Sequence, residues 1–146
     1  MRSLSCSRPS YVRFFNLSPN RVDIIWINYE GIGVTYKTLN PREYHDVNTF
    51  VSHPWIFRNS STFDAMTTFT AEGHKRNDLV FKPIETSSRK IVFITLPFYS
   101  LKERCFRRLR DLKLSDSDIA GFEIPRTLKD DYNFFLKNGH TVNNGE

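Results

Sequence analysis

The sequence has little cysteine, and this scarcity excludes two classes of protein. Cys6 and Cys105 are the two cysteines, and about a hundred residues separate them. A disulfide-held domain carries several closely spaced cysteines, and a structural zinc site needs ligands in short, paired spacings. The sequence therefore predicts neither a disulfide framework nor a metal site, and we expect no cofactor.

Long apolar stretches and runs of like charge are also missing. The N-terminal stretch MRSLSCSRPS lacks the apolar segment of a secretory signal, and no stretch approaches membrane-spanning length. We expect a reducing, intracellular setting, cytoplasmic and nuclear, without a membrane partner. The formal net charge is +5, but the basic residues are dispersed, so we do not expect nucleic acid as a partner.

Catalytic signatures are equally sparse. All six glycines are isolated, which excludes a glycine-rich phosphate loop. His45, His53 or His74 could act as a base for Cys105, but the sequence alone does not place any of them beside it. The sequence favours a protein without catalytic residues, and a cysteine-dependent enzyme stays an alternative.

Short β-prone runs, separated by turn residues, occupy the first two-thirds of the chain. Val22 to Tyr29 is the longest, and its apolar side chains fall on both faces. Many short strands at moderate spacing are typical of an antiparallel sandwich, so we expect a β-sandwich over residues 8–97. The expected strands are 11–15, 22–29, 34–39, 47–51, 54–58, 65–70, 79–83 and 91–96.

After the stretch TLPFYS the pattern changes from strands to helices. Ser100 can cap a first helix, with Glu103 at the spacing of a capping box. Ser115 or Ser117 can cap a short second helix, which Gly121 ends.

A third helix is predicted to begin at Pro125 and to end at Gly139. The fold class is therefore α+β in two parts: the sandwich, then a small helical domain at 98–138, with flexible termini at 1–7 and 139–146. A helical part of this size seldom forms a stable core alone, so it should dock onto the β part or onto another protein. The apolar stripe of the third helix consists of Leu128, Tyr132, Phe135 and Leu136.

The first predicted helix carries a cysteine within an apolar stripe. Leu101, Cys105 and Leu109 are spaced four residues apart, and Leu112 continues the series among many charged residues. A thiol in this setting can be a nucleophile, a small core residue, or part of a surface for another protein. The sequence favours the surface and leaves the other two open.

Aromatic and hydrogen-bonding residues gather between positions 36 and 55. If they project together, they form an apolar box for a compact ligand that is mostly hydrocarbon with one hydroxyl. Alternatively, the aromatic residues fill the core and His53 caps a turn, an interpretation that composition alone favours. The residues concerned are Tyr36, Asn48, Thr49, His53 and Trp55, together with Trp26 on the preceding long strand.

Four stretches resemble the von Hippel–Lindau tumour suppressor family: SPNRVDIIWINYEG, TYKTL, SHPWIFR and ITLPFYSLKERC. The last of these has Ser100-Leu101, Cys105 and Leu109 at the spacing of a general elongin C-binding box. The resemblance extends from about Arg8 to Leu136. It implies a substrate receptor of a cullin-RING ubiquitin ligase, an adaptor with no catalytic residues of its own.

The resemblance also implies the partners of the helical domain. A helix of that domain would insert into elongin C, which with elongin B and a cullin-RING scaffold recruits the ubiquitin-transfer machinery. The residues that would contact elongin C are Ser100, Leu101, Lys102, Arg104, Cys105, Arg108 and Leu109.

For the β domain, the resemblance implies binding of a 4-hydroxyproline in hypoxia-inducible factor α, followed by ubiquitination and proteasomal degradation of that substrate. Trp26, Tyr36 and Trp55 would contact the ligand ring. His53 and Thr49 would hydrogen-bond its hydroxyl, and the family usually has a serine at the position of Thr49. Along the peptide backbone would lie Val47 and Asn48.

One other function stays open. A basic β domain could bind nucleic acid, with an affinity that weakens steeply as salt is added. The side chains for this alternative are Lys75, Arg76, Arg107, Arg108 and Arg110.

Overall fold

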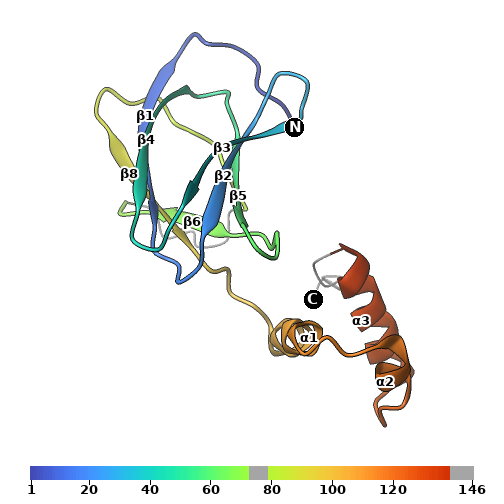
Figure 1. Cartoon of the computed structure of the whole chain (residues 1–146). Coiled ribbons are helices and arrows are strands. Elements are labelled where there is room, and N and C mark those ends of the chain that lie inside the picture. Colours follow the sequence, from blue (N-terminus) through green and yellow to red (C-terminus); the bar gives the residue numbers. More distant parts are fainter. Residues whose placement is uncertain (73–78, 139–146) are drawn as a thin grey trace. The chain divides into compact units, whose positions relative to one another are not determined.

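The polypeptide divides into a β unit, Met1–Phe98, and a helical unit, Tyr99–Glu146 (Figure 1). The computed structural model describes residues 1–72 and 79–138. Each unit surrounds an apolar core of its own. No helix within these described ranges is both long and apolar enough to cross a membrane.

Eight strands form within the described part of the β unit, close to the positions that the sequence predicts. The largest difference is at the N-terminal edge of β4, which starts three residues earlier than expected, at Tyr44 rather than Val47. The strands are β1 Pro9–Asn16, β2 Val22–Ile27, β3 Gly33–Leu39, β4 Tyr44–Phe50, β5 Trp55–Asn59, β6 Thr67–Thr70, β7 Val80–Phe81 and β8 Lys90–Thr95.

The strands build two four-stranded sheets, in the orders β4-β1-β8-β6 and β3-β2-β5-β7. The second sheet is antiparallel throughout, but β1 and β8 of the first run parallel, with Phe14 opposite Val92. The prediction of an antiparallel sandwich is therefore wrong for this pair. Turn residues indicate hairpins between successive strands, and they contain no signal for a pairing between strands so far apart in the sequence.

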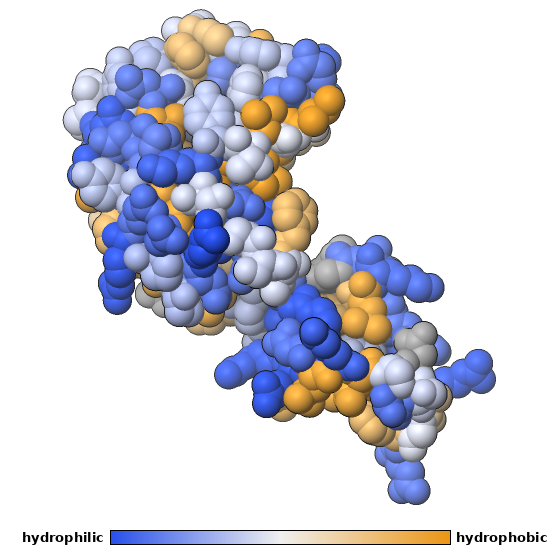
Figure 2. Space-filling model, viewed as in Figure 1, coloured by the Kyte–Doolittle hydropathy of each residue, from blue (hydrophilic) through white to orange (hydrophobic). Residues whose placement is uncertain are grey.

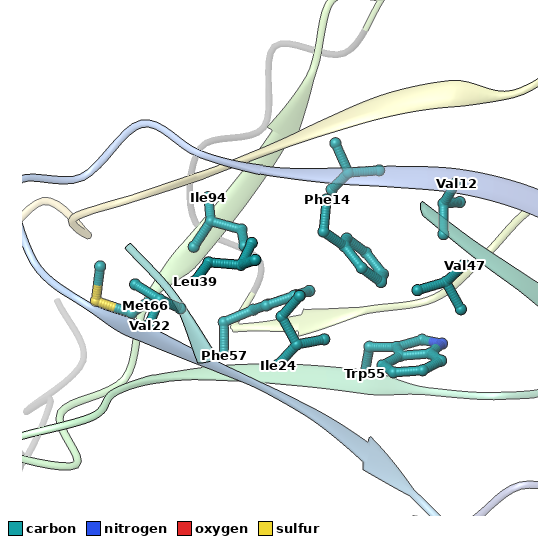
Figure 3. Packing of buried hydrophobic residues seen from close by; sticks show 11 residues of the cluster. Val12, Phe14, Val22, Ile24, Leu39, Val47, Trp55, Phe57, Met66 and Ile94 are labelled. Carbon is teal, nitrogen blue, oxygen red and sulfur yellow. The ribbon is translucent and has the colours of Figure 1, made fainter. Parts of the chain in front are cut away.

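Alternation along the strands creates the core between the sheets. In β1 the side chains of Val12 and Phe14 are buried, whereas the intervening residues face outward. The ring of Phe14 lies 5.4 Å from that of Trp55 and 5.0 Å from that of Phe57, both on the opposite sheet (Figure 3). Burial of each such side chain contributes about 1.5–3 kcal/mol to folding.

The end of β2 shapes the loop that follows it. The strand stops at Ile27 because the side chain of Asn28 accepts hydrogen bonds from the backbone N–H groups of Glu30 and Ile32. Gly31 has a φ of 83°, which a residue with a Cβ rarely adopts. Tyr29, predicted within the strand, therefore lies in this turn.

Residues 99–138, the described part of the helical unit, form three helices: α1 Leu101–Asp111, α2 Asp116–Ala120 and α3 Arg126–Asn138. Ser100 caps α1 by accepting a hydrogen bond from the N–H of Glu103, as predicted. Ser115, rather than Ser117, caps α2 and forms a reciprocal capping box with Asp118. The predicted end of the third helix at Gly139 lies outside the described residues.

A small cluster holds these helices together. Phe106, from α1, packs against Tyr132 and Phe135 of α3, with Ile119 of α2 completing the buried set. Leu136, which the sequence places in the buried stripe of α3, is exposed. Four buried side chains are a small core, so the helical unit has little apolar burial to offset its chain entropy.

Candidate functional site

The two sheets meet at a seam between their edge strands β3 and β4. The chain crosses from one sheet to the other twice there, through the β3–β4 turn and through the turn that precedes β5. This topology brings together side chains from β2, β3, β4 and β5. Five predicted site residues take part: Trp26, Tyr36, Thr49, His53 and Trp55.

Aromatic rings line the seam. Tyr36 has its ring centroid 5.0 Å from that of Trp55 and 6.3 Å from that of Trp26. The centroid of the Trp26 ring lies 5.4 Å from that of the His53 ring. Trp55 is buried and also contacts the core, whereas 54% of Tyr36 is exposed. The structure confirms that Trp55 fills the core. The box for a ligand stays a prediction, with Trp55 as its floor and Tyr36 as its rim.

Thr49 supplies a buried hydroxyl to this floor. Its Oγ1 accepts a hydrogen bond of 3.2 Å from the indole Nε1 of Trp55. A hydroxyl that accepts one bond keeps its own proton for another acceptor. Thr49 can therefore donate to an oxygen of a bound ligand.

His53 supplies the second polar group. Only 7% of the residue is exposed, its backbone N–H donates to the carbonyl of Phe50, and its Nε2 lies 3.2 Å from the hydroxyl oxygen of Tyr29. Burial lowers the pKa of His53, because the charged imidazolium loses its hydration, so the ring is neutral at pH 7. Within the described part of the chain, no group hydrogen-bonds its Nδ1, which stays available to a ligand.

The structure separates Val47 and Asn48 from these five. The side chain of Val47 belongs to the apolar core, and its carbonyl accepts a hydrogen bond from Arg89. The amide oxygen of Asn48 also accepts from Arg89, at 2.8 Å. Their strand nevertheless offers a backbone: in the described ranges β4 pairs with β1 alone, so its other edge can take an extended peptide.

Tyr29 and Cys6 are site residues that the sequence did not indicate. The Sγ of Cys6 lies 2.9 Å from the Tyr29 hydroxyl oxygen and 3.8 Å from Nε2 of His53. Cys6 falls in the stretch 1–7, for which we expected flexibility, but two serines of this stretch are hydrogen-bonded across the site. Ser3 accepts from Nε1 of Trp26 at 2.7 Å, and the N–H of Ser5 donates to Ser52 at 3.0 Å.

On the helical unit, α1 presents two different faces. Phe106 points into the small core, whereas Leu101 is 79% exposed and Cys105 is exposed as well. Leu109 is half-buried at the border between the faces. Figure 2 shows apolar surface beside charged side chains on this unit. Leu101 and Cys105, two of the residues predicted to contact a partner, thus form an uncovered stripe on α1 within the described structure.

The charged residues predicted beside this stripe have mixed surroundings. Arg104 and Arg108 are exposed, as contacts with a partner would require. Lys102 instead forms a salt bridge of 3.0 Å with Asp131, which ties α1 to α3.

Two of the residues of the nucleic-acid alternative contact aromatic rings within the helical unit. The guanidinium of Arg107 lies over the ring of Tyr99, and that of Arg110 over the ring of Phe135. Both therefore take part in packing within the helical unit. Lys75 and Arg76 lie outside the described residues.

For the enzyme alternative, residues 99–138 contain no histidine, so this part of the chain offers Cys105 no imidazole base. In the β unit the thiol that lies near His53 is that of Cys6. His74 lies outside the described residues. The structure therefore gives the enzyme alternative no assembled cysteine–histidine pair around Cys105 in residues 99–138.

The chain is similar to known proteins both in its β unit and over most of its length. A family model described as the VHL beta domain matches residues 1–78. Protein Vhl of Drosophila melanogaster is 31% identical over 137 residues, covering 82% of this chain and 73% of the fly protein. The second match extends the similarity beyond the β unit.

Proposed function

The chain belongs to the von Hippel–Lindau (VHL) family, and on that premise we propose that it is the substrate-recognition subunit of a cullin-RING ubiquitin ligase. Its β unit binds 4-hydroxyproline in hypoxia-inducible factor α, and its helical unit binds elongin C, which joins elongin B and the cullin scaffold. The substrate is then ubiquitinated and degraded by the proteasome. The protein acts as an adaptor in cytoplasm and nucleus.

The observation that carries this proposal is the meeting of three aromatic rings with two polar groups at the seam. The ring of a proline is apolar and compact, and the cluster of Trp26, Tyr36 and Trp55 offers it aromatic surface to contact. Thr49 and His53 supply a donor and an acceptor for the single hydroxyl. This combination supports a hydroxylated proline as the ligand.

The same groups explain why unmodified proline is rejected. When proline occupies the site, the hydroxyl of Thr49 and the Nδ1 of His53 are shut off from water without a partner. Each unpaired group costs about 1–3 kcal/mol. Two such groups give a selectivity on the order of a thousandfold.

The free edge of β4 supports a peptide as the carrier of this residue. An extended segment can add to the sheet there by main-chain hydrogen bonds, beside the strand that carries Thr49. The backbone of Val47 and Asn48 would lie along this segment. The site therefore binds hydroxyproline within a strand.

The exposed stripe of α1 supports the second half of the proposal. Leu101 and Cys105 lie one helical turn apart and are both uncovered, next to charged side chains. A small residue at position 105 lets the helix approach a partner closely, whereas a larger one would overfill the contact. The stripe is suited to insertion into a groove of elongin C.

Titration of the purified protein with two matched peptides tests the receptor function. The peptides have the same sequence and differ only in one residue, 4-hydroxyproline or proline. We expect calorimetry to show binding of the hydroxylated peptide with at least a hundredfold preference. Equal affinities for the two peptides would refute the proposal.

A further inference from the structure

The hydrogen-bonded groups beneath the candidate site include two residues to which no role has yet been given. The imidazole of His53 is followed by the hydroxyl of Tyr29 at 3.2 Å and then by the thiol of Cys6 at 2.9 Å. Cys6 is exposed, so this series of groups runs from the buried imidazole to the surface. Each of the three can donate or accept a hydrogen bond.

Trp55 fixes the direction of the protons at the ligand. An indole N–H only donates, so the oxygen of Thr49 must accept from Trp55 and must send its own proton onwards. In the bound state this proton goes to the hydroxyl oxygen of the ligand. The proton of the ligand hydroxyl then needs an acceptor, and the free Nδ1 of His53 is the one the site provides.

We propose that Tyr29 and Cys6 determine specificity by holding the neutral ring of His53 with its proton on Nε2. In this arrangement Nε2–H donates to the hydroxyl oxygen of Tyr29, and the Tyr29 O–H donates to the sulfur of Cys6. Nδ1 is then left as an acceptor before any ligand arrives. The role in ligand selection rests on the proposed function, whereas the tautomer is a property of the free protein.

Three further observations fit this direction. Burial lowers the pKa of His53, so the ring does not carry the second proton that would remove the acceptor. The hydrogen bond to Cys6 raises the pKa of Tyr29, as expected when the phenol donates its proton. The flanking hydrogen bond between Ser5 and Ser52 fixes the segment that carries Cys6 beside the turn that carries His53.

With this tautomer, the site requires a ligand that donates a hydrogen bond to Nδ1 of His53. The hydroxyl of hydroxyproline donates this bond, whereas unmodified proline has only a C–H group at that position. The opposite tautomer would present Nδ1–H to the ligand and leave two donors, with that of Thr49, aimed at one oxygen. Tyr29 and Cys6 thus keep His53 as the hydrogen-bond acceptor of the site, while Thr49 is the donor.

Two-bond ¹H–¹⁵N correlation spectra of the His53 ring in the free full-length protein test the proposal. We expect an unprotonated Nδ1 and a protonated Nε2 in the wild type. In Tyr29→Phe the ring should lose this bias, and the preference for hydroxyproline peptide over proline peptide should fall roughly three- to tenfold. Cys6→Ser should behave as wild type, because serine retains an acceptor, and Cys6→Ala should resemble Tyr29→Phe in direction.

Tyr44→Phe is the matched control. It removes a phenol hydroxyl from the same β unit, but the Tyr44 ring lies under Arg13 on the outer face, away from His53. Spectrum and selectivity should both be unchanged. A wild-type ring protonated on Nδ1, or a Tyr29→Phe spectrum identical to wild type, would overturn the proposal. Equal binding of both peptides by wild type would instead refute the receptor function, because the spectra do not depend on a ligand.

Discussion

The indole nitrogen of Trp55 lies 3.2 Å from the hydroxyl oxygen of Thr49, although the two residues stand on strands of different sheets. Both side chains are almost completely buried. The hydrogen bond therefore connects the sheets beside the apolar core and positions the threonine hydroxyl at the same time. Stability and the proposed ligand recognition would therefore depend on the same pair.

Replacement of Thr49 tests this double role. Thr49→Val keeps the shape but removes the oxygen, so the buried indole N–H loses its acceptor and the unfolding free energy should fall by about 1–3 kcal/mol. The preference for hydroxyproline peptide should fall about tenfold. Thr49→Ser keeps the hydroxyl and should retain the preference. Chemical denaturation and calorimetry measure the two effects.

The exposed stripe of α1 predicts a loss of partner binding without a loss of fold. Leu101→Glu and Cys105→Arg should each abolish co-purification with elongin C, because a charge would be buried unpaired in the contact. The melting temperature of the β unit should be unchanged. Leu136→Glu, on an exposed position of α3, is the control and should still co-purify. Recovery of the full complex from both α1 variants would show that the stripe is not the contact.

Truncation of a side chain to alanine should affect stability very differently on the two faces of α1. Phe106→Ala empties a buried position in a core of four side chains and should destabilise the helical unit by about 3–5 kcal/mol. Leu101→Ala should change stability by less than about 0.5 kcal/mol, because the side chain is exposed. Hydrogen exchange of the α3 amides measures the stability of the helical unit in both variants. Similar protection in the two variants would contradict the assignment of the faces.

The buried imidazole predicts a pH dependence of stability. Burial lowers the pKa of His53 below its ordinary value of 6.5, so the unfolded chain takes up a proton more readily than the folded one. The contribution of the neutral imidazole to the unfolding free energy is fully present above pH 6.5. It is lost as the pH falls below this value, towards the pKa that His53 has in the folded protein. Melting temperatures measured between pH 8 and pH 5 should fall more steeply for wild type than for His53→Gln. Parallel curves would exclude this role of His53.

Local features of the sequence predicted local features of the structure. Turn residues located all the strands of the described β unit, and Ser100 and Ser115 cap helices as their spacing indicates. These signals are reliable because a cap or a turn is decided by neighbours within a few residues. The apolar stripe on α1 was visible for the same reason.

Features that depend on distant parts of the chain were not predictable. The proximity of Cys6 to Tyr29 and His53 follows from the way in which the N-terminal segment crosses the site, and nothing near Cys6 in sequence encodes it. Phe106 shows a related limit. The four-residue spacing of Leu101, Cys105 and Leu109 marks one apolar face of α1. The core of the helical unit is instead formed with the neighbouring face, which carries Phe106.

The parallel pairing of β1 with β8 has a consequence for biosynthesis. Strand β8 is the last strand of its unit to leave the ribosome, yet it occupies an interior place in its sheet, between β1 and β6. The antiparallel pairing of β1 with β4 can form early. Strand β6 pairs with β8, so it cannot join this sheet until residues 90–95 have emerged. A nascent chain of this protein therefore keeps an open sheet edge for most of its synthesis, and a truncation just before Lys90 would make that state permanent.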